Sequence, residues 1–258
     1  MPFFSALQST FNAHGPAAER IAGLSWFMTI LFLLVTLIMW VLLAVAFTKQ
    51  RGSLKEHATI DIGGGQAWIA IGGLAVPLLV LTVIFVLGLQ LLADFPIHGT
   101  RGSGMHDGMA MSTVQAAPKP DIRIVGHQWW WEVQYLTGSQ DQQFTTANEI
   151  HIPAHRAVNI ELETADVMHS FWVPSLHGKV DLIPGFPNFI RIEAREAGNF
   201  QGQCAEFCGV QHAHMGLLVV AQEPADFQAW LTNQRKPAAE PATAAALAGR
   251  QVFLAGYF

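Results

Sequence analysis

Two long apolar runs near the N-terminus dominate the hydrophobic pattern of the chain. No charged residue occurs from Ile21 to Thr48 or from Ile62 to Ala93. A helix rises about 1.5 Å per residue, so about 20 apolar residues cross the ~30 Å hydrocarbon core of a bilayer. Both runs are longer than that, and longer than the apolar region of a signal peptide. The pattern therefore predicts a transmembrane helix hairpin over residues 21–93, rather than two buried core helices, with Pro77 placed to kink the second helix.

The charges around the hairpin predict its orientation. The connector between the two runs carries Lys49, Arg51 and Lys55, whereas the flank before the first run has one arginine offset by a glutamate. Loops rich in Lys and Arg favour the cytoplasmic side, so the connector is expected inside. The N-terminal extension, residues 1–20, and everything after residue 93 are then expected outside, in the periplasm of a bacterial inner membrane.

After the hairpin the pattern changes from helical to β. Residues 94–120 are rich in Gly, Pro and Ser and are expected to form a linker. Between residues 121 and 235, short stretches alternate apolar and polar positions, as half-buried strands do. Several such strands separated by turns predict an antiparallel sandwich or barrel. The clearest stretches are Ile122–Tyr135, Ala157–Glu163, Asn188–Glu196 and Gly216–Glu223, followed by a short helix over Pro224–Gln234 and a Pro/Ala-rich tail over residues 236–258.

Composition narrows the classes of function. Hydrophobic residues make up 51% of the chain and charged residues 13%, which is typical of a protein partly inside a membrane. The net charge of −5 argues against a nucleic-acid partner. The chain has 2 cysteines, too few for a disulfide framework.

Both cysteines lie in one short segment, CAEFCGVQHAHM, which runs from Cys204 to Met215. Cys204, Cys208 and His212 follow one another at intervals of four residues, and Met215 comes three residues later. Thiolate, imidazole and thioether groups are the soft and borderline ligands that suit copper. Two cysteine thiolates can bridge two copper ions. Each ion would then take one histidine and one weak axial ligand.

The remaining ligands of such a centre can be sought in the surrounding sequence. The best second histidine is His169 in DVMHSFWVPSL, which is expected in a loop before Pro174. The weak axial ligands would be the sulfur of Met215 and the backbone carbonyl of Glu206, the residue held between the cysteines. This reading predicts a binuclear copper site.

Other readings of the same residues stay open at this point. A Cys204–Cys208 disulfide is plausible outside the cytoplasm. A zinc site with two cysteines and two histidines is also possible, although Met215 favours copper. His214 competes with His212 as a ligand, but the four-residue step from Cys208 favours His212.

The chain resembles subunit II of the haem–copper cytochrome c oxidases across nearly its whole length. The resemblance lies in the hairpin and, in this order, in GHQWWWEVQY, DVMHSFWVPSLHGKVDLIPG and GQCAEFCGVQHAHM. It implies an N-terminal two-helix transmembrane hairpin plus an all-β cupredoxin domain of Greek-key topology over residues 121–235. It also implies the binuclear copper centre called CuA, with the ligands His169, Cys204, the carbonyl of Glu206, Cys208, His212 and Met215.

The resemblance implies roles for further residues. The side chain of Glu206 would also reach a magnesium ion at the boundary with subunit I, and Asp181 would lie near that boundary. Trp129 would be exposed, at the point where cytochrome c docks and its electron enters. Adjacent strand residues point to opposite faces, so Trp129, Trp130 and Trp131 cannot all be buried on one side.

The function expected from the resemblance is that of an electron-accepting oxidase subunit. It would take electrons from cytochrome c at the copper centre and pass them to a haem in subunit I, where oxygen is reduced and protons are pumped. The alternative is a membrane-anchored copper-binding or copper-delivery protein without an electron-transfer partner. A quinol oxidase subunit would keep the fold but lack copper, and the intact ligand set argues against it.

Three places depart from the family pattern or extend it. Many relatives have a glutamate at the cytoplasmic start of the second helix, serving a proton channel, whereas the nearest acid here is Asp61. His177 stands where relatives usually have a residue that does not titrate. Residues 236–258 resemble the beginning of a fused cytochrome c domain but lack its CxxCH motif. We therefore expect no haem on this chain, and weak packing of this tail against the sandwich.

Overall fold

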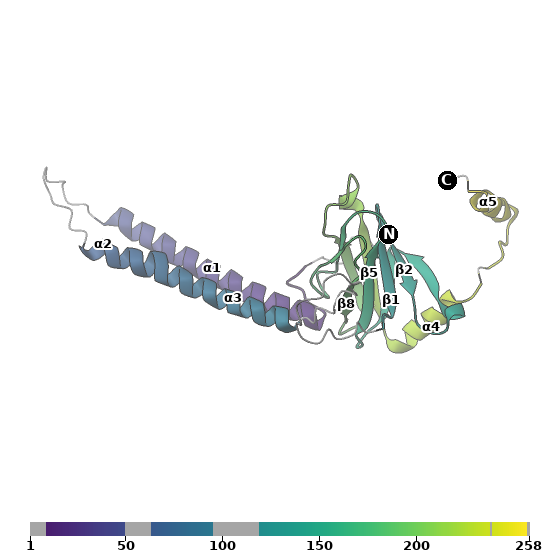
Figure 1. Ribbon diagram of the computed structural model, residues 1–258, viewed down its shortest axis with the longest axis horizontal. Coiled ribbons are helices and arrows are strands. Elements are labelled where there is room, and N and C mark those ends of the chain that lie inside the picture. The colour runs from purple at the N-terminus through teal and green to yellow at the C-terminus, as the bar shows by residue number, and fades with distance from the viewer. Residues whose placement is uncertain (1–8, 50–62, 95–118, 238, 257–258) are drawn as a thin grey trace, which may run out of the picture.

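The protein consists of a long helical hairpin that projects from one end of a β-sandwich (Figure 1). The computed structural model describes residues 9–49, 63–94, 119–237 and 239–256. Most of the predicted linker at 94–120 therefore lies outside the described residues, and so does the acid Asp61.

The hairpin has the length and composition needed to cross a bilayer. Helix α1 runs over Pro16–Thr48, and its partner is built of α2 (Gly63–Trp68), the π-helical segment η1 (Ile69–Ala75) and α3 (Val76–Asp94). The most apolar window of each helix is not buried by any other part of the protein. At ~1.5 Å per residue, the 33 residues of α1 extend about 50 Å. The prediction of two transmembrane helices is thus confirmed, although α1 begins five residues before the apolar run.

The irregularity expected at Pro77 takes the form of π-helical turns on its N-terminal side. Proline has no N–H to donate, and its ring collides with the carbonyl four residues earlier. The η1 segment absorbs this change, and at its end the N–H of Val76 bonds to the carbonyl of Ile71, five residues back. The apolar helix therefore continues through Pro77 to Asp94 instead of ending there.

The β-domain is a sandwich of two five-stranded sheets. One sheet has the strand order β3-β2-β1-β5-β8 and the other β4-β10-β9-β6-β7. Most neighbours are antiparallel, but β1–β5 and β4–β10 are parallel pairs, so strands distant in sequence lie side by side as in a Greek key. The strands are β1 (Ile122–His127), β2 (Trp130–Tyr135), β3 (Phe144–Ala147), β4 (Glu149–Pro153), β5 (Val158–Thr164), β6 (His169–Trp172), β7 (Val180–Leu182), β8 (Asn188–Ile192), β9 (Gly198–Cys204) and β10 (Gly216–Gln222).

One predicted strand is in fact a hairpin. The stretch Ile122–Tyr135 folds back on itself, with Ile122 opposite Tyr135 and His127 opposite Trp130. The turn consists of Gln128 and Trp129. Neither residue type is common in turns, so the aromatic and β-branched pattern predicts one continuous strand here.

The core lies between the two sheets and follows the period-2 pattern of the strands. Alternate residues of β1, β2 and β10 are buried, with Ile124, Trp131 and Val219 fully covered. Helix α4 spans Pro224–Gln234, as predicted, and buries Phe227 and Leu231 against the sandwich. A last helix, α5 (Ala244–Leu254), lies away from the sandwich (Figure 1), with Leu254 71% exposed.

The beginning of α1 is attached directly to the sandwich. The N–H of His14 bonds to the carbonyl of Ser175 at 2.7 Å, and the carbonyl of His14 accepts the N–H of Arg195 at 2.9 Å. Glu19 forms an ion pair with Arg195 at 2.7 Å. The sandwich therefore sits at the N-terminal end of α1, and α1 ends at Thr48, at the opposite end of the hairpin (Figure 1).

Candidate metal centre

The strands β9 and β10 bring the two ends of the Cys204–Met215 segment together. Cys204 is the last residue of β9, and Met215 immediately precedes β10. Because these strands are antiparallel neighbours, the N–H of Cys204 bonds to the carbonyl of Met215 at 2.9 Å. The ten residues between them form a loop at one end of the sandwich, which includes a short 3-10 helix over His212–His214.

The structure corrects the expected position of His169, which lies in a strand instead of a loop. It opens β6, which pairs with β9 so that Phe171 stands opposite Cys204. The imidazole is fully buried and crosses Gly126 of β1, where an added Cβ would lie 2.8 Å from its Cδ2. Gly126 is thus required for the close approach of this ring.

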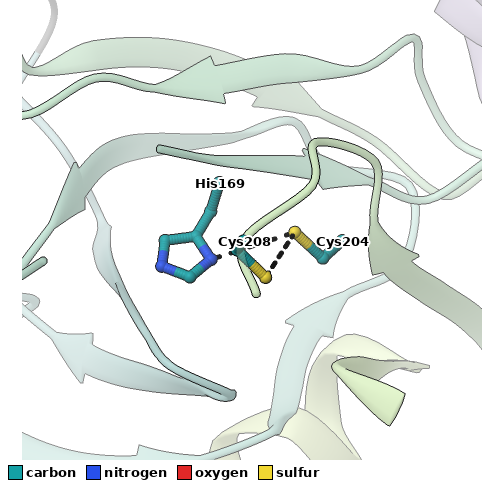
Figure 2. Close-up of side chains that lie close together, drawn as sticks. All are labelled: His169, Cys204 and Cys208. Carbon is teal, nitrogen blue, oxygen red and sulfur yellow. Dashed lines mark hydrogen bonds between the residues drawn. The ribbon is translucent and has the colours of Figure 1, made fainter. Parts of the chain in front are cut away.

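The four other predicted donors lie close to the sulfurs of the two cysteines. The Sγ atoms of Cys204 and Cys208 are 3.9 Å apart, and His169 Nδ1 lies 3.9 Å from Cys204 Sγ. Figure 2 shows these three side chains converging from β6, β9 and the loop. On the other side, His212 Nδ1 is 3.6 Å and Met215 Sδ 3.7 Å from Cys208 Sγ. The carbonyl oxygen of Glu206 is 3.2 Å from Cys204 Sγ.

This donor set fits a pair of thiolate-bridged soft metal ions. A metal–thiolate bond is about 2.3 Å long, so two sulfurs 3.9 Å apart can both contact the same ion. One imidazole lies beside each sulfur, and the weak donors Met215 Sδ and Glu206 O lie beside different sulfurs as well. Both cysteines are free, and the exposed His214 is the less suitable of the two neighbouring histidines.

The two thiols differ in how readily they ionise. Burial raises the pKa of Cys204, but hydrogen bonds with His169 and with backbone groups outweigh it and bring the pKa to about 6. Burial and the negative charge on Cys204 raise the pKa of Cys208 to about 12. Two thiolates this close repel each other, so cations are needed to hold both of them deprotonated.

A carboxylate that sequence analysis did not single out supports His169. Asp166 Oδ1 accepts a hydrogen bond from His169 Nε2 at 2.8 Å. Burial by itself would lower the pKa of His169, but its hydrogen bonds to Cys204 and Asp166 raise it overall. A carboxylate on the outer nitrogen orients the imidazole and leaves Nδ1 free for a metal. The three-residue spacing from Asp166 to His169 is the only sequence signal for this contact.

The three tryptophans occupy three different environments. Trp131 is fully buried, edge-on to Phe171, whereas Trp130 is 38% exposed and stacks on His127. Trp129 is half-buried in the turn between β1 and β2, and its Nε1 donates to the carbonyl of Cys208 at 3.1 Å. The expectation that Trp129 is the exposed member of the run is therefore wrong, because the turn lays its indole against the metal-site loop.

Two predicted acidic residues approach the same edge of the site. Glu206 is half-buried in the loop, directly after Ala205, whose N–H bonds to the carbonyl of Ser170. Asp181 of β7 pairs with Ser170 of β6. His177 is half-buried, and burial lowers its pKa.

Comparison with known proteins agrees with these features. A profile of the family "Cytochrome C oxidase subunit II, periplasmic domain" matches residues 136–222. A cytochrome c oxidase subunit 2 of Alkalihalophilus pseudofirmus is 31% identical over 95% of this chain and 67% of its own length. One of Arabidopsis thaliana is 34% identical over 50% of this chain and 58% of its own length.

Solved structures give a likeness of smaller extent. The periplasmic domain of subunit II of cytochrome oxidase from Bradyrhizobium japonicum is 29% identical, covers 46% of this chain and 96% of its own, and has a TM-score of 0.42.

The fold and the site together define a membrane-anchored β-sandwich protein with a cysteine- and histidine-rich site suited to copper. Within that class, the extent of the match to the bacterial relative is decisive. The chain belongs to the cytochrome c oxidase subunit II family.

Proposed function

We propose that this chain is the electron-accepting subunit of a haem–copper terminal oxidase. It takes single electrons from reduced cytochrome c and passes them to a haem in subunit I, which carries out the oxygen chemistry. The observation that carries the proposal is the pair of free, buried cysteines with sulfurs 3.9 Å apart, each beside one imidazole. When bound there, a thiolate-bridged copper pair supplies a one-electron acceptor whose geometry changes little on reduction.

The residues of the site have distinct roles in this proposal. Cys204 and Cys208 would hold the metals through their thiolates, and His169 and His212 would supply the other strong ligands, one beside each sulfur. Met215 and the carbonyl of Glu206 would be weak ligands, of the kind that tune redox potential. The burial of these donors excludes water, since His169, Cys208 and Met215 are at most 3% exposed.

Trp129 is the proposed point where the electron enters. Its indole is half-buried, so one edge remains available to a docked donor, while Nε1 contacts the carbonyl of a bridging cysteine. A magnesium ion held by the Glu206 side chain, near Asp181, is proposed at the boundary with subunit I. We assign no haem to this chain, because both of its cysteines belong to the copper site.

The arrangement of hairpin and sandwich supports a location for the site. The sandwich is attached to the beginning of α1, and α1 ends at Thr48, after which the connector begins in the sequence. In a membrane that the hairpin spans, the sandwich and the connector would therefore be on opposite sides. The connector carries the basic residues, which favours the cytoplasm for it and the periplasm of a bacterial inner membrane for the sandwich.

The rival function, copper delivery, is less well supported. A delivery site must release its metal to a partner, which favours exposed and replaceable ligands. Here Cys204 and Cys208 are 4% and 3% exposed, and His169 is held from behind by Asp166. These contacts favour a permanent site.

Electron paramagnetic resonance of the full-length chain, loaded with copper and oxidised, tests the proposal. We expect the hyperfine pattern of one unpaired electron shared by two coppers. The simpler pattern of an isolated copper ion would contradict it.

A further inference from the structure

The turn between β1 and β2 is fastened to the metal-site loop by side chains other than the metal donors. The carbonyl oxygen of Cys208 accepts two hydrogen bonds, from Gln128 Nε2 at 2.7 Å and from Trp129 Nε1 at 3.1 Å. Both donors come from adjacent residues, and they share one acceptor. The indole is therefore held in one position against the backbone of a proposed copper ligand.

Gly209 makes the room that this contact needs. Its φ of +118° lies in a region that favours glycine. A Cβ at this position would lie 3.0 Å from Gln128 Nε2 and 3.1 Å from Trp129 Cζ2. Both distances are shorter than ordinary van der Waals contacts. Any larger residue would therefore press on the two side chains that hold the turn in place.

The same turn is also tied to the other half of the site. The backbone N–H of Gln128 bonds to Asp166 Oδ2 at 2.8 Å, while Asp166 Oδ1 accepts the bond from His169. The turn is thus connected to Cys208 through side chains and to His169 through Asp166. Its position relative to the metal donors is determined from two directions.

We propose that Gln128 and Gly209 are positioning residues for electron uptake, because they hold the Trp129 indole against the carbonyl of Cys208. This inference rests on the proposed function. The resulting route runs from the indole through the Nε1–H···O hydrogen bond to the Cys208 backbone and on to its Sγ. One electron leaves the donor and one arrives at the metal centre, and no bond forms or breaks. If the clamp is lost, the electron must cross a longer gap, while the surface that binds the donor is unchanged.

Two variants disrupt the clamp in different ways. Gln128→Met removes the amide donor but keeps the length of the side chain, and Gly209→Ala adds the obstructing Cβ. Gly185→Ala is the matched control, since Gly185 also has a positive φ, of +78°, but apart from its chain neighbours no atom of the described residues lies within 4 Å of an added Cβ. Trp129→Ala serves as the reference for complete loss of the route.

The variants are compared in the intact oxidase by transient electron transfer from reduced cytochrome c. Both clamp variants should slow electron uptake, though less than Trp129→Ala does, because the indole remains in the protein but is displaced from the carbonyl of Cys208. The KM for the donor and the copper resonance spectrum should match those of the natural protein. Hydrogen–deuterium exchange should become faster at residues 127–131, and Gly185→Ala should behave like the natural protein.

The outcomes separate this inference from the proposed function. Normal rates in both clamp variants, with a slow Trp129→Ala, would overturn the clamp and leave the proposed function intact. A normal rate in Trp129→Ala would overturn the inference together with the entrance role of Trp129. Slow uptake with an altered copper spectrum would also overturn it, since the residues would then act on the ligands. If Gly209→Ala does not assemble, Gln128→Met alone decides.

Discussion

At the scale of single residues, the site is built of buried donors that other residues hold in place. The imidazole of His169 is fixed between Gly126, which leaves space for it, and Asp166, which accepts its Nε2–H. The two thiols cannot easily ionise together, because burial and the negative charge on Cys204 raise the pKa of Cys208. The protein thus provides a set of mostly buried donors, and bound cations would relieve the repulsion between the two thiolates.

Substitution of a cysteine ligand should have a larger effect on the copper site than substitution of the methionine ligand. Cys208→Ser should abolish the two-copper centre, because one thiolate cannot bridge two ions as two do. Met215→Leu removes only a weak donor and should keep both coppers while shifting the reduction potential. Copper content per chain and redox titration measure the two effects. A Cys208→Ser protein that retains two coppers per chain would refute the bridging role.

Asp166 gives a second prediction at this scale. Asp166→Asn removes the charge behind the imidazole and should lower copper affinity about 10- to 100-fold, the usual cost of losing such a carboxylate. Competition titration with a copper chelator measures the change. Asp141→Asn, at a fully exposed carboxylate, is the control. Equal affinities in the two variants would show that Asp166 does not support the metal site.

At the scale of elements, the strands and the first helix set the distances on which the site depends. Pairing of β9 with both β6 and β10 brings Cys204 beside His169 and Met215. The hairpin turn between β1 and β2 then closes over the loop. At the N-terminal end of α1, the preceding chain is pressed onto the sandwich so tightly that Gly15 lies against the carbonyls of Leu176 and Glu193.

Gly15 offers a test of how firmly the helix is attached. In Gly15→Ala the added Cβ would lie 2.6 Å from both carbonyl oxygens, and neither backbone group can move aside easily. We expect a loss of about 1–3 kcal/mol in the free energy of unfolding, as for other overpacked sites. Thermal unfolding of the detergent-solubilised chain measures it. Gly23→Ala lies inside α1, where no described atom outside the helix's own backbone and chain neighbours is within 4 Å of the added Cβ, and it should not destabilise the protein. Similar losses in both variants would instead indicate a general effect on α1.

At the scale of the whole molecule, the full length of α1 separates the β-sandwich from Thr48, after which the basic connector begins in the sequence. This geometry makes the location of one determine the location of the other. If the hairpin spans the membrane, the copper site faces the compartment opposite to the connector.

The orientation can be measured in whole cells. With an epitope inserted after Ser53 in the connector, protease added to spheroplasts should digest the sandwich and leave the epitope protected. After the cells are lysed, the epitope should become accessible. Protection of the sandwich and digestion of the epitope in intact spheroplasts would reverse the proposed orientation.

Features that depend on local pattern could be predicted from the sequence alone. Two uncharged runs sufficed for the hairpin, because length and apolarity are all that a membrane span requires. The spacing within Cys204–Met215 was enough to identify most of the donors, since they lie in one loop. The strand Val158–Thr164 and the helix Pro224–Gln234 were equally visible, because their apolar positions recur with the period of the element.

Contacts between residues distant in the sequence became clear only from the folded structure. Alternation shows which face of a strand is buried but not which strand lies beside it, so the places of His169 in β6 and of Trp129 in a turn were missed. Asp166, Gln128 and Gly209 have no motif of their own, and their roles arise where three chain segments converge. These contacts exist because sheet pairing brings together residues up to 80 positions apart, which no local pattern encodes.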